Sequence, residues 1–149
     1  MRRILIATEG SPCSDEAVRH FVQTMGVGPT EAFALCVIPP VKGYHTIEQA
    51  EHQLEEALMQ ADQALSSASA EGASAGLRIR SMRRVGDPVE TILLVAKEIS
   101  ADLIVLGTHG PEGLANLAGS SVAEGVLREA QCGVVIFPWH PVLLAPTAG

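Results

Sequence analysis

Aromatic side chains are scarce in this chain: Phe, Trp and Tyr together make up 3% of its 149 residues. Proteins that bind single-stranded nucleic acid usually stack the bases on aromatic rings, so the composition argues against that function. Apolar residues still account for 47% of the chain, and they must form an aliphatic core of Leu, Ile, Val and Ala. The length suits one domain with one core.

Basic residues are also few, with 10 Lys and Arg against 17 Asp and Glu, which gives a net charge of −7. Such a protein repels a phosphate backbone unless its basic groups cluster. The densest basic cluster contains Arg78, Arg80, Arg83 and Arg84. Its arginines either keep a solvated edge strand from pairing with other strands or form a local site for an anion or a partner. We expect no nucleic-acid partner.

Cysteine is limited to Cys13, Cys36 and Cys132. They form no CxxC pair, and their odd number argues against a disulfide framework. A reducing cytosol fits this pattern best. The first apolar run, residues 4–7, is too short for a signal peptide, and no stretch approaches the ~20 apolar residues of a membrane span. We therefore expect a cytoplasmic protein with no membrane partner.

The spacing of apolar residues predicts five strands that alternate with four helices. The expected strands are residues 4–7, 32–38, 77–85, 103–106 and 134–137. The expected helices are residues 14–25, 46–70, 88–99, and a last helix that starts at Ser120 or Ser121 and ends near Ala130. Strict alternation is typical of βαβ units, and it predicts a three-layer α/β domain with a mostly parallel sheet. We expect the domain to span residues 1–140, with a loose tail at 141–149.

Two strand ends carry the candidate site, because ligands of open α/β sheets bind beyond the carboxyl ends of the strands. The first is residues 7–11, ATEGS, and the second is residues 107–110, GTHG. Glycine lets backbone N–H groups approach an anion, and a helix beginning at Ser120 or Ser121 adds unpaired donors and a positive dipole end. These residues fit a phosphate site, and they also fit a plain strand-to-helix loop.

Familiar enzyme motifs are missing from the sequence. No GxxxxGK followed by Ser or Thr is present, no GxGxxG follows a strand, and no Ser/His/Asp triad is recognisable. No residue stands out as a catalytic base. If the chain binds ATP, we therefore expect hydrolysis to be slow and incidental at most.

Longer segments make the interpretation more specific. The ATEGS strand end, the turn VGDPVETI and the stretch ADLIVLGTHGPEGLANLAGSSVAEGVLREAQCGVVIFP resemble the universal stress protein family over residues 3–138. The nucleotide-binding branch of that family is marked by Gly, two residues, Gly, nine residues, then Gly and Ser or Thr. Gly107 and Gly110 match the first two glycines, and Ser121 matches the last position.

Ser120 stands where the family motif has its third glycine. The other alignment places Gly119 there and deletes one residue from the loop. If the position needs a left-handed backbone, a serine costs roughly 1–2 kcal/mol, and if that strain arises only on binding it weakens affinity about tenfold. If the backbone there is ordinary, Ser120 can give one more hydroxyl to the phosphates.

The resemblance implies an adenine-nucleotide alpha-hydrolase-like fold with strand order 3-2-1-4-5. It also implies ATP as the ligand, with AMP or ADP as alternatives, and a Mg ion held through the nucleotide near Glu9, where the family usually has Asp. Adenine would meet the backbone at Val37. The residues placed around the nucleotide are Ala7, Thr8, Glu9, Val37, Leu106, Gly107, His109, Gly110, Ser120, Ser121 and Val122.

The resemblance further implies a stress-response regulatory protein that acts as a homodimer with an unknown regulatory partner. The dimer would form through the last strand, between Val134 and Phe137. The alternative within the family is a dimeric signalling scaffold that binds no nucleotide. Gly107 and Gly110 favour nucleotide binding, whereas Ser120 and Glu9 favour the scaffold.

Overall fold

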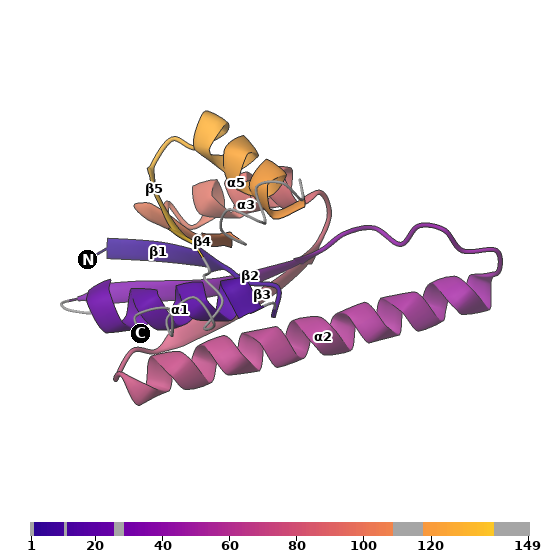
Figure 1. Ribbon diagram of the computed structural model, residues 1–149, viewed down its shortest axis with the longest axis horizontal. Coiled ribbons are helices and arrows are strands. Elements are labelled where there is room, and N and C mark those ends of the chain that lie inside the picture. The colour runs from indigo at the N-terminus through magenta and orange to yellow at the C-terminus, as the bar shows by residue number, and fades with distance from the viewer. Residues whose placement is uncertain (1, 11, 26–28, 109–117, 139–149) are drawn as a thin grey trace, which may run out of the picture.

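The computed structural model describes residues 2–10, 12–25, 29–108 and 118–138, with only the backbone described at 12, 13, 25, 108, 118–121 and 138. Figure 1 shows a central sheet with helices on both faces. The expected tail at 141–149 and most of the loop after the fourth strand lie outside these residues.

Strands and helices alternate in the predicted order. The elements are β1 (Arg2–Ala7), α1 (Pro12–Met25), β2 (Thr30–Ile38), α2 (Ile47–Ser74), β3 (Ile79–Val85), α3 (Pro88–Glu98), β4 (Leu103–Thr108), α5 (Ala118–Glu129) and β5 (Gly133–Pro138). All four strand pairings are parallel, and the sheet order is β3-β2-β1-β4-β5. Within the described residues, this confirms the predicted three-layer fold, with its five strands, four helices and strand order.

Each face of the sheet has its own apolar core. Helices α1 and α2 cover one face, where Ile4, Ile6 and Phe21 belong to a buried cluster. Helices α3 and α5 cover the other face, where Leu5, Val95 and Val126 are buried. Successive residues of a strand point to opposite faces, so a strand buried on both sides must be continuously apolar, as in the centre of β1.

Helix caps fix several boundaries. The Thr46 side chain accepts a 3.1 Å hydrogen bond from the Gln49 backbone N–H and caps α2. The Asp87 carboxylate accepts a 3.0 Å bond from the Glu90 backbone N–H and caps α3, whose first residue is Pro88. Short polar side chains at these positions satisfy N–H groups that have no partner inside the helix, and proline is favoured at the first helical position because it lacks an N–H.

Helix α2 is 28 residues long, and only its second half packs tightly on the sheet. Ala61, Leu65 and Ala68 are buried there, as their spacing predicts. The same apolar stripe continues into the first half, where Ile47 is 75% exposed and Leu54 is 36% exposed. In Figure 1 this first half extends beyond the end of the sheet. No helix in the described residues is long and apolar enough to cross a membrane.

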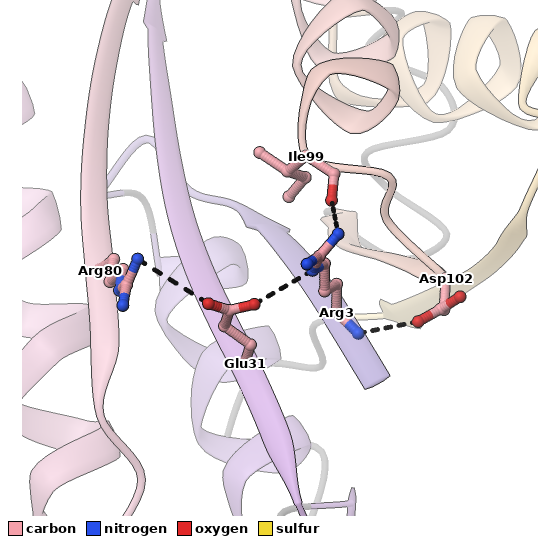
Figure 2. A network of polar contacts seen from close by, with 5 residues as sticks. All are labelled: Arg3, Glu31, Arg80, Ile99 and Asp102. Carbon is pink, nitrogen blue, oxygen red and sulfur yellow. Dashed lines mark hydrogen bonds and ion pairs between the residues drawn. The ribbon is translucent and has the colours of Figure 1, made fainter. Parts of the chain in front are cut away.

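A polar network ties together the amino ends of the strands, as Figure 2 shows. Arg3 Nε donates to Glu31 Oε1 at 3.1 Å, and Arg80 Nη1 lies 3.8 Å from Glu31 Oε2. Arg3 Nη1 also donates to the Ile99 carbonyl at 3.3 Å. The Arg3 backbone N–H donates to Asp102 Oδ2 at 2.8 Å. The network therefore links β1, β2, β3 and the connection between α3 and β4.

Candidate functional site

A pocket of about 440 Å³ lies at the other end of the strands from this network, beyond the carboxyl ends of β1, β2 and β4. Because β1 and β4 are neighbours, the two strand ends marked by the sequence converge on it. Seven residues from the predicted site line the pocket: Ala7, Thr8, Glu9, Val37, Leu106, Gly107 and Val122. Its volume falls within the range of small-molecule sites, roughly 300–1,000 Å³.

A short chain of hydrogen bonds holds the end of β1. The Thr8 backbone N–H donates to the Leu35 carbonyl at 2.9 Å. The buried Thr8 and Ser14 hydroxyls lie 3.2 Å apart, with Thr8 as donor, and the Glu9 backbone N–H donates to Ser14 Oγ at 3.3 Å. These bonds fix the path of the chain on which the Glu9 carboxylate is carried.

Ser14 therefore has a different role from the one its residue type suggests. A serine at the start of the expected helix, residues 14–25, is a typical N-cap residue. The structure starts α1 at Pro12, so Ser14 lies inside the first turn. Its hydroxyl serves the loop after β1 instead.

The pocket has an apolar floor and a polar opening. Leu35, Ile38 and Leu106 are buried lining residues, whereas Glu9 and Gln60 are exposed to solvent. An apolar floor suits a flat, weakly polar ring system, and polar groups at the opening suit hydroxyls or charged groups. The pocket can thus hold a ligand with one apolar end and one polar end.

Sequence reasoning missed the wall supplied by helices. Ala57, Gln60 and Ala61 of α2 line the pocket, as do Pro88 and Ile92 of α3. Ala57 and Ala61 lie on the apolar stripe of α2, and small residues on such a stripe indicate close packing without showing whether a pocket lies beside them. Gln60 carries no such signal in the sequence. The further lining residues not predicted are Ser14, Leu35, Cys36, Ile38, Pro39 and Ala123.

Cys36 brings a buried thiol to the pocket wall, with 4% of the residue exposed. Burial raises the pKa of this thiol, and the carboxylates of Glu9 and Asp62 raise the pKa further. Neutral thiols are poor nucleophiles. Cys36 is therefore a small apolar lining residue at neutral pH.

Part of the predicted site lies outside the described residues, namely His109 and Gly110. Ser120 and Ser121 are described by their backbone, which belongs to α5. This helix begins at Ala118, so the predicted start at Ser120 or Ser121 was two or three residues late. A residue inside an α-helix has negative φ, so Ser120 needs no left-handed backbone and its serine brings no such strain.

No group of three or more His, Cys, Asp or Glu side chains converges among the residues that the structure describes. Glu9 is the acidic residue that lines the pocket. A single carboxylate is too small a ligand set for a protein-only divalent site. Any magnesium ion here would need oxygen ligands from the bound molecule.

Comparison with known proteins gives the chain a family. The model of the universal stress protein family matches residues 1–138. A universal stress protein of Methanocaldococcus jannaschii is 31% identical over 137 residues, which cover 91% of this chain and 81% of that protein.

Solved structures agree on the fold. A universal stress protein in complex with cAMP has a TM-score of 0.70 at 23% identity, with 91% of this chain and 96% of the other covered. An Arabidopsis thaliana family member with AMP bound has a TM-score of 0.69 at 14% identity, with 94% and 93% covered. The protein from Archaeoglobus fulgidus in complex with dAMP has a TM-score of 0.64 at 18% identity, with 91% and 97% covered.

Proposed function

The chain belongs to the universal stress protein family, and we propose that it is a regulatory protein that binds ATP in the pocket at the carboxyl ends of β1 and β4. One observation carries the proposal: seven residues chosen from the sequence for a nucleotide site line one cavity of suitable size. Relatives of the same fold that bind cAMP, AMP and dAMP support an adenine nucleotide as the ligand.

Adenine lies on the apolar floor, with the Val37 backbone at its edge. The ribose lies near Glu9 at the pocket opening, because a carboxylate accepts hydrogen bonds from ribose hydroxyls. The phosphates lie toward Gly107, Gly110 and the amino end of α5, whose N–H groups and dipole favour negative charge. A Mg ion held by the phosphates lies near the Glu9 carboxylate and offsets its repulsion of the phosphates.

The proposal includes a homodimer that pairs the β5 edge of two copies. β5 is the last strand of the sheet, and the side chains of Val134, Val135 and Ile136 are half-buried in the single chain. An edge strand with such side chains can pair with a twin and bury what remains exposed. The proposal also includes a cytoplasmic location, which the cysteine content supports.

The direct test is titration of the purified protein with Mg-ATP by calorimetry, together with analysis of nucleotide released on denaturation. We expect saturable heat or co-purified adenine nucleotide. If neither is found at millimolar ATP, the ATP proposal fails and the scaffold alternative within the family gains support.

A matched pair of variants ties binding to the pocket. Ala57→Phe puts a ring on the pocket wall, whereas Ala73→Phe puts the same ring on an exposed position of the same helix. We expect Ala57→Phe to weaken ATP binding at least tenfold and Ala73→Phe to leave it unchanged. Circular dichroism on both variants shows whether the domain remains folded. Equal affinities in the two folded variants would place ATP elsewhere.

A further inference from the structure

The first half of α2, residues 47–58, is a helix whose apolar stripe the described chain covers only in part; we name it the α2 arm. Ala57 and Leu58, at its inner end, pack against the core, whereas Ile47 is 75% exposed and Leu54 is 36% exposed. Ile47 and Leu54 continue the stripe that Ala61 and Leu65 bury against the sheet. Figure 1 shows the start of α2 extending beyond the end of the sheet, which agrees with the exposure of these two side chains. An amphipathic helix normally buries its apolar stripe.

The α2 arm is also strongly acidic. It carries Glu48, Glu51, Glu55 and Glu56, and the sequence holds no Lys or Arg between Lys42 and Arg78. Glu51 lies four residues after Ile47 and three before Leu54, so it belongs to the same face of the helix. The surface that covers this face must therefore be apolar and basic.

The same chain has a surface of that kind on β3. Helix α2 covers β3 from one side, with Ile79 buried and Arg83 paired to Asp62 at 2.9 Å. By strand alternation, the opposite side presents Arg80, Met82 and Arg84. On this second side α3 packs over β2, and it reaches β3 through the 2.9 Å bond between Arg84 and Glu98.

Apolar groups accompany these arginines. Phe33 and Met82 are half-buried and adjoin the α3-side core, and Leu94 on α3 is 54% exposed. Arg80 is paired with Glu31 and lies over the Phe33 ring. Arg78 is exposed and falls on the same side by alternation, so it carries most of the unneutralised positive charge. We call this side of the strand the β3 face.

We propose that the α2 arm of one copy docks on the β3 face of a second copy, and that the arm of the second copy docks on the β3 face of the first. A chain cannot satisfy its own β3 face with its own arm, because its α2 lies on the other side of the sheet. The two surfaces are complementary in charge and similar in extent. The 12-residue arm is ~18 Å long at 1.5 Å per residue, and a seven-residue strand spans ~23 Å.

Reciprocity follows from the symmetry of identical chains. Each copy has one arm and one face, so a two-fold axis satisfies both contacts at once and closes the assembly. This contact is separate from the β5 pairing proposed above, since β3 and β5 form opposite edges of the sheet. It does not depend on nucleotide binding.

The test is sedimentation velocity of three charge variants at low and high protein concentration. Glu51→Arg reverses a charge on the docking side of the arm, whereas Glu56→Arg makes the same change on the opposite side of the same helix. We expect Glu51→Arg to weaken the association at least tenfold and to halve the mass at concentrations where the wild type is assembled. Glu56→Arg should leave the mass unchanged.

The double variant Glu51→Arg with Arg78→Glu decides whether the β3 face is the docking surface. We expect it to restore at least half of the lost association, because the two charges are exchanged rather than removed. A wild-type mass insensitive to Glu51→Arg, or equally sensitive to Glu56→Arg, overturns the proposal. If a double variant with native circular dichroism does not restore association, the β3 face is not the docking surface. Assembly through β5 alone would give a mass that is insensitive to Glu51→Arg.

Discussion

The two ends of the parallel strands are built in different ways, and we call them the amino edge and the carboxyl edge of the sheet. At the amino edge, Arg3 and Glu31 join three strands and the α3–β4 connection through hydrogen bonds and ion pairs. At the carboxyl edge, the strands end in a cavity of about 440 Å³ whose floor is apolar. At the amino edge the polar groups pair with one another, whereas the carboxyl edge leaves room for a ligand.

This difference has a physical origin in parallel sheets. Every strand ends at the same edge, and chain crossovers separate the loops after β1 and β4, so a crevice forms between them. Polar groups at the amino edge can pair within the chain without closing any site. The comparison therefore predicts that changes at the carboxyl edge alter binding more than changes at the amino edge.

The largest effect is expected from Gly10→Ala at the carboxyl edge. Gly10 has φ of +83°, and an added Cβ would lie 3.2 Å from the Ala64 Cβ. Left-handed backbone costs a non-glycine residue roughly 1–2 kcal/mol, and the close contact adds to it. We expect a loss of about 2 kcal/mol in unfolding free energy and at least tenfold weaker ATP binding.

Gly76→Ala is the matched control for that change. Gly76 has φ of +77°, with no atom within 4 Å of an added Cβ, and its neighbours in the chain do not line the pocket, whereas Gly10 directly follows the lining residue Glu9. Urea denaturation should show a loss of about 1 kcal/mol, from the backbone alone, and calorimetry should show unchanged affinity. Equal losses of affinity in the two variants would remove the special role of the carboxyl edge.

Thr8→Val is the next largest change, and it removes the hydroxyl that donates to Ser14. The Thr8 side chain is buried, and one buried hydrogen bond contributes roughly 0.5–1.5 kcal/mol. We expect a loss of about 1 kcal/mol in unfolding free energy and about threefold weaker ATP binding, because the path of Glu9 is loosened.

Thr24→Val removes the same hydroxyl from the exposed end of α1, where it donates to the His20 carbonyl at 2.6 Å. Calorimetry on both variants should show a change in affinity for Thr8→Val only. Unchanged binding by folded Thr8→Val protein would mean that the Thr8–Ser14 bond positions nothing at the site.

Glu31→Gln tests the amino edge with a smaller expected effect. It removes the charge that lies between Arg3 and Arg80, both of which are about half exposed. Exposed ion pairs contribute roughly 0.2–1 kcal/mol, so we expect a loss of about 0.5 kcal/mol by urea denaturation. ATP affinity should stay within twofold of the wild type. A larger drop in affinity would show that the two edges are coupled, and it would contradict the expectation that the amino edge has little effect on binding.

The sequence was sufficient for the strands of the sheet and for seven of the eighteen residues that line the pocket. Continuous apolar runs such as 32–38 indicate strands buried on both sides, and turn residues after β1 and β4 mark the ends that carry ligands. Family resemblance supplied the strand order, which places those ends together. Glu9 and Gly107 could be assigned to one site for that reason.

The spacing of apolar residues could not predict which part of the molecule packs against a helix. It gave α2 one apolar stripe from Ile47 to Ala68, but burial of that stripe depends on where the sheet stops. Nor could residue type decide the partner of Ser14, because a hydroxyl near a helix start can accept from several backbone N–H groups. Gln60 lines the pocket only because α2 passes beside β2. These features depend on tertiary contacts.

The smallest effect concerns two thiols, one at each edge. Burial raises the pKa of Cys36 beside the pocket, and burial together with Asp102 raises the pKa of Cys132, which directly precedes β5. A raised folded pKa means that the stability from the neutral thiol is complete below the unfolded value near 9.0 and is lost as pH rises through the folded value. Neither thiol should affect stability at pH 7, but both should lower it above pH 9.

ATP distinguishes the two thiols. In a Cys13→Ser background, iodoacetamide labelling followed by peptide mass spectrometry should report each rate separately. Cys36 is 4% exposed and Cys132 is half-buried, so Cys132 should react faster at pH 8. Saturating ATP should slow Cys36 at least fivefold and leave Cys132 unchanged, because only Cys36 lies on the pocket wall. Equal protection of both thiols would indicate that ATP stabilises the whole domain rather than covering one edge, since global stabilisation suppresses every opening that exposes a thiol.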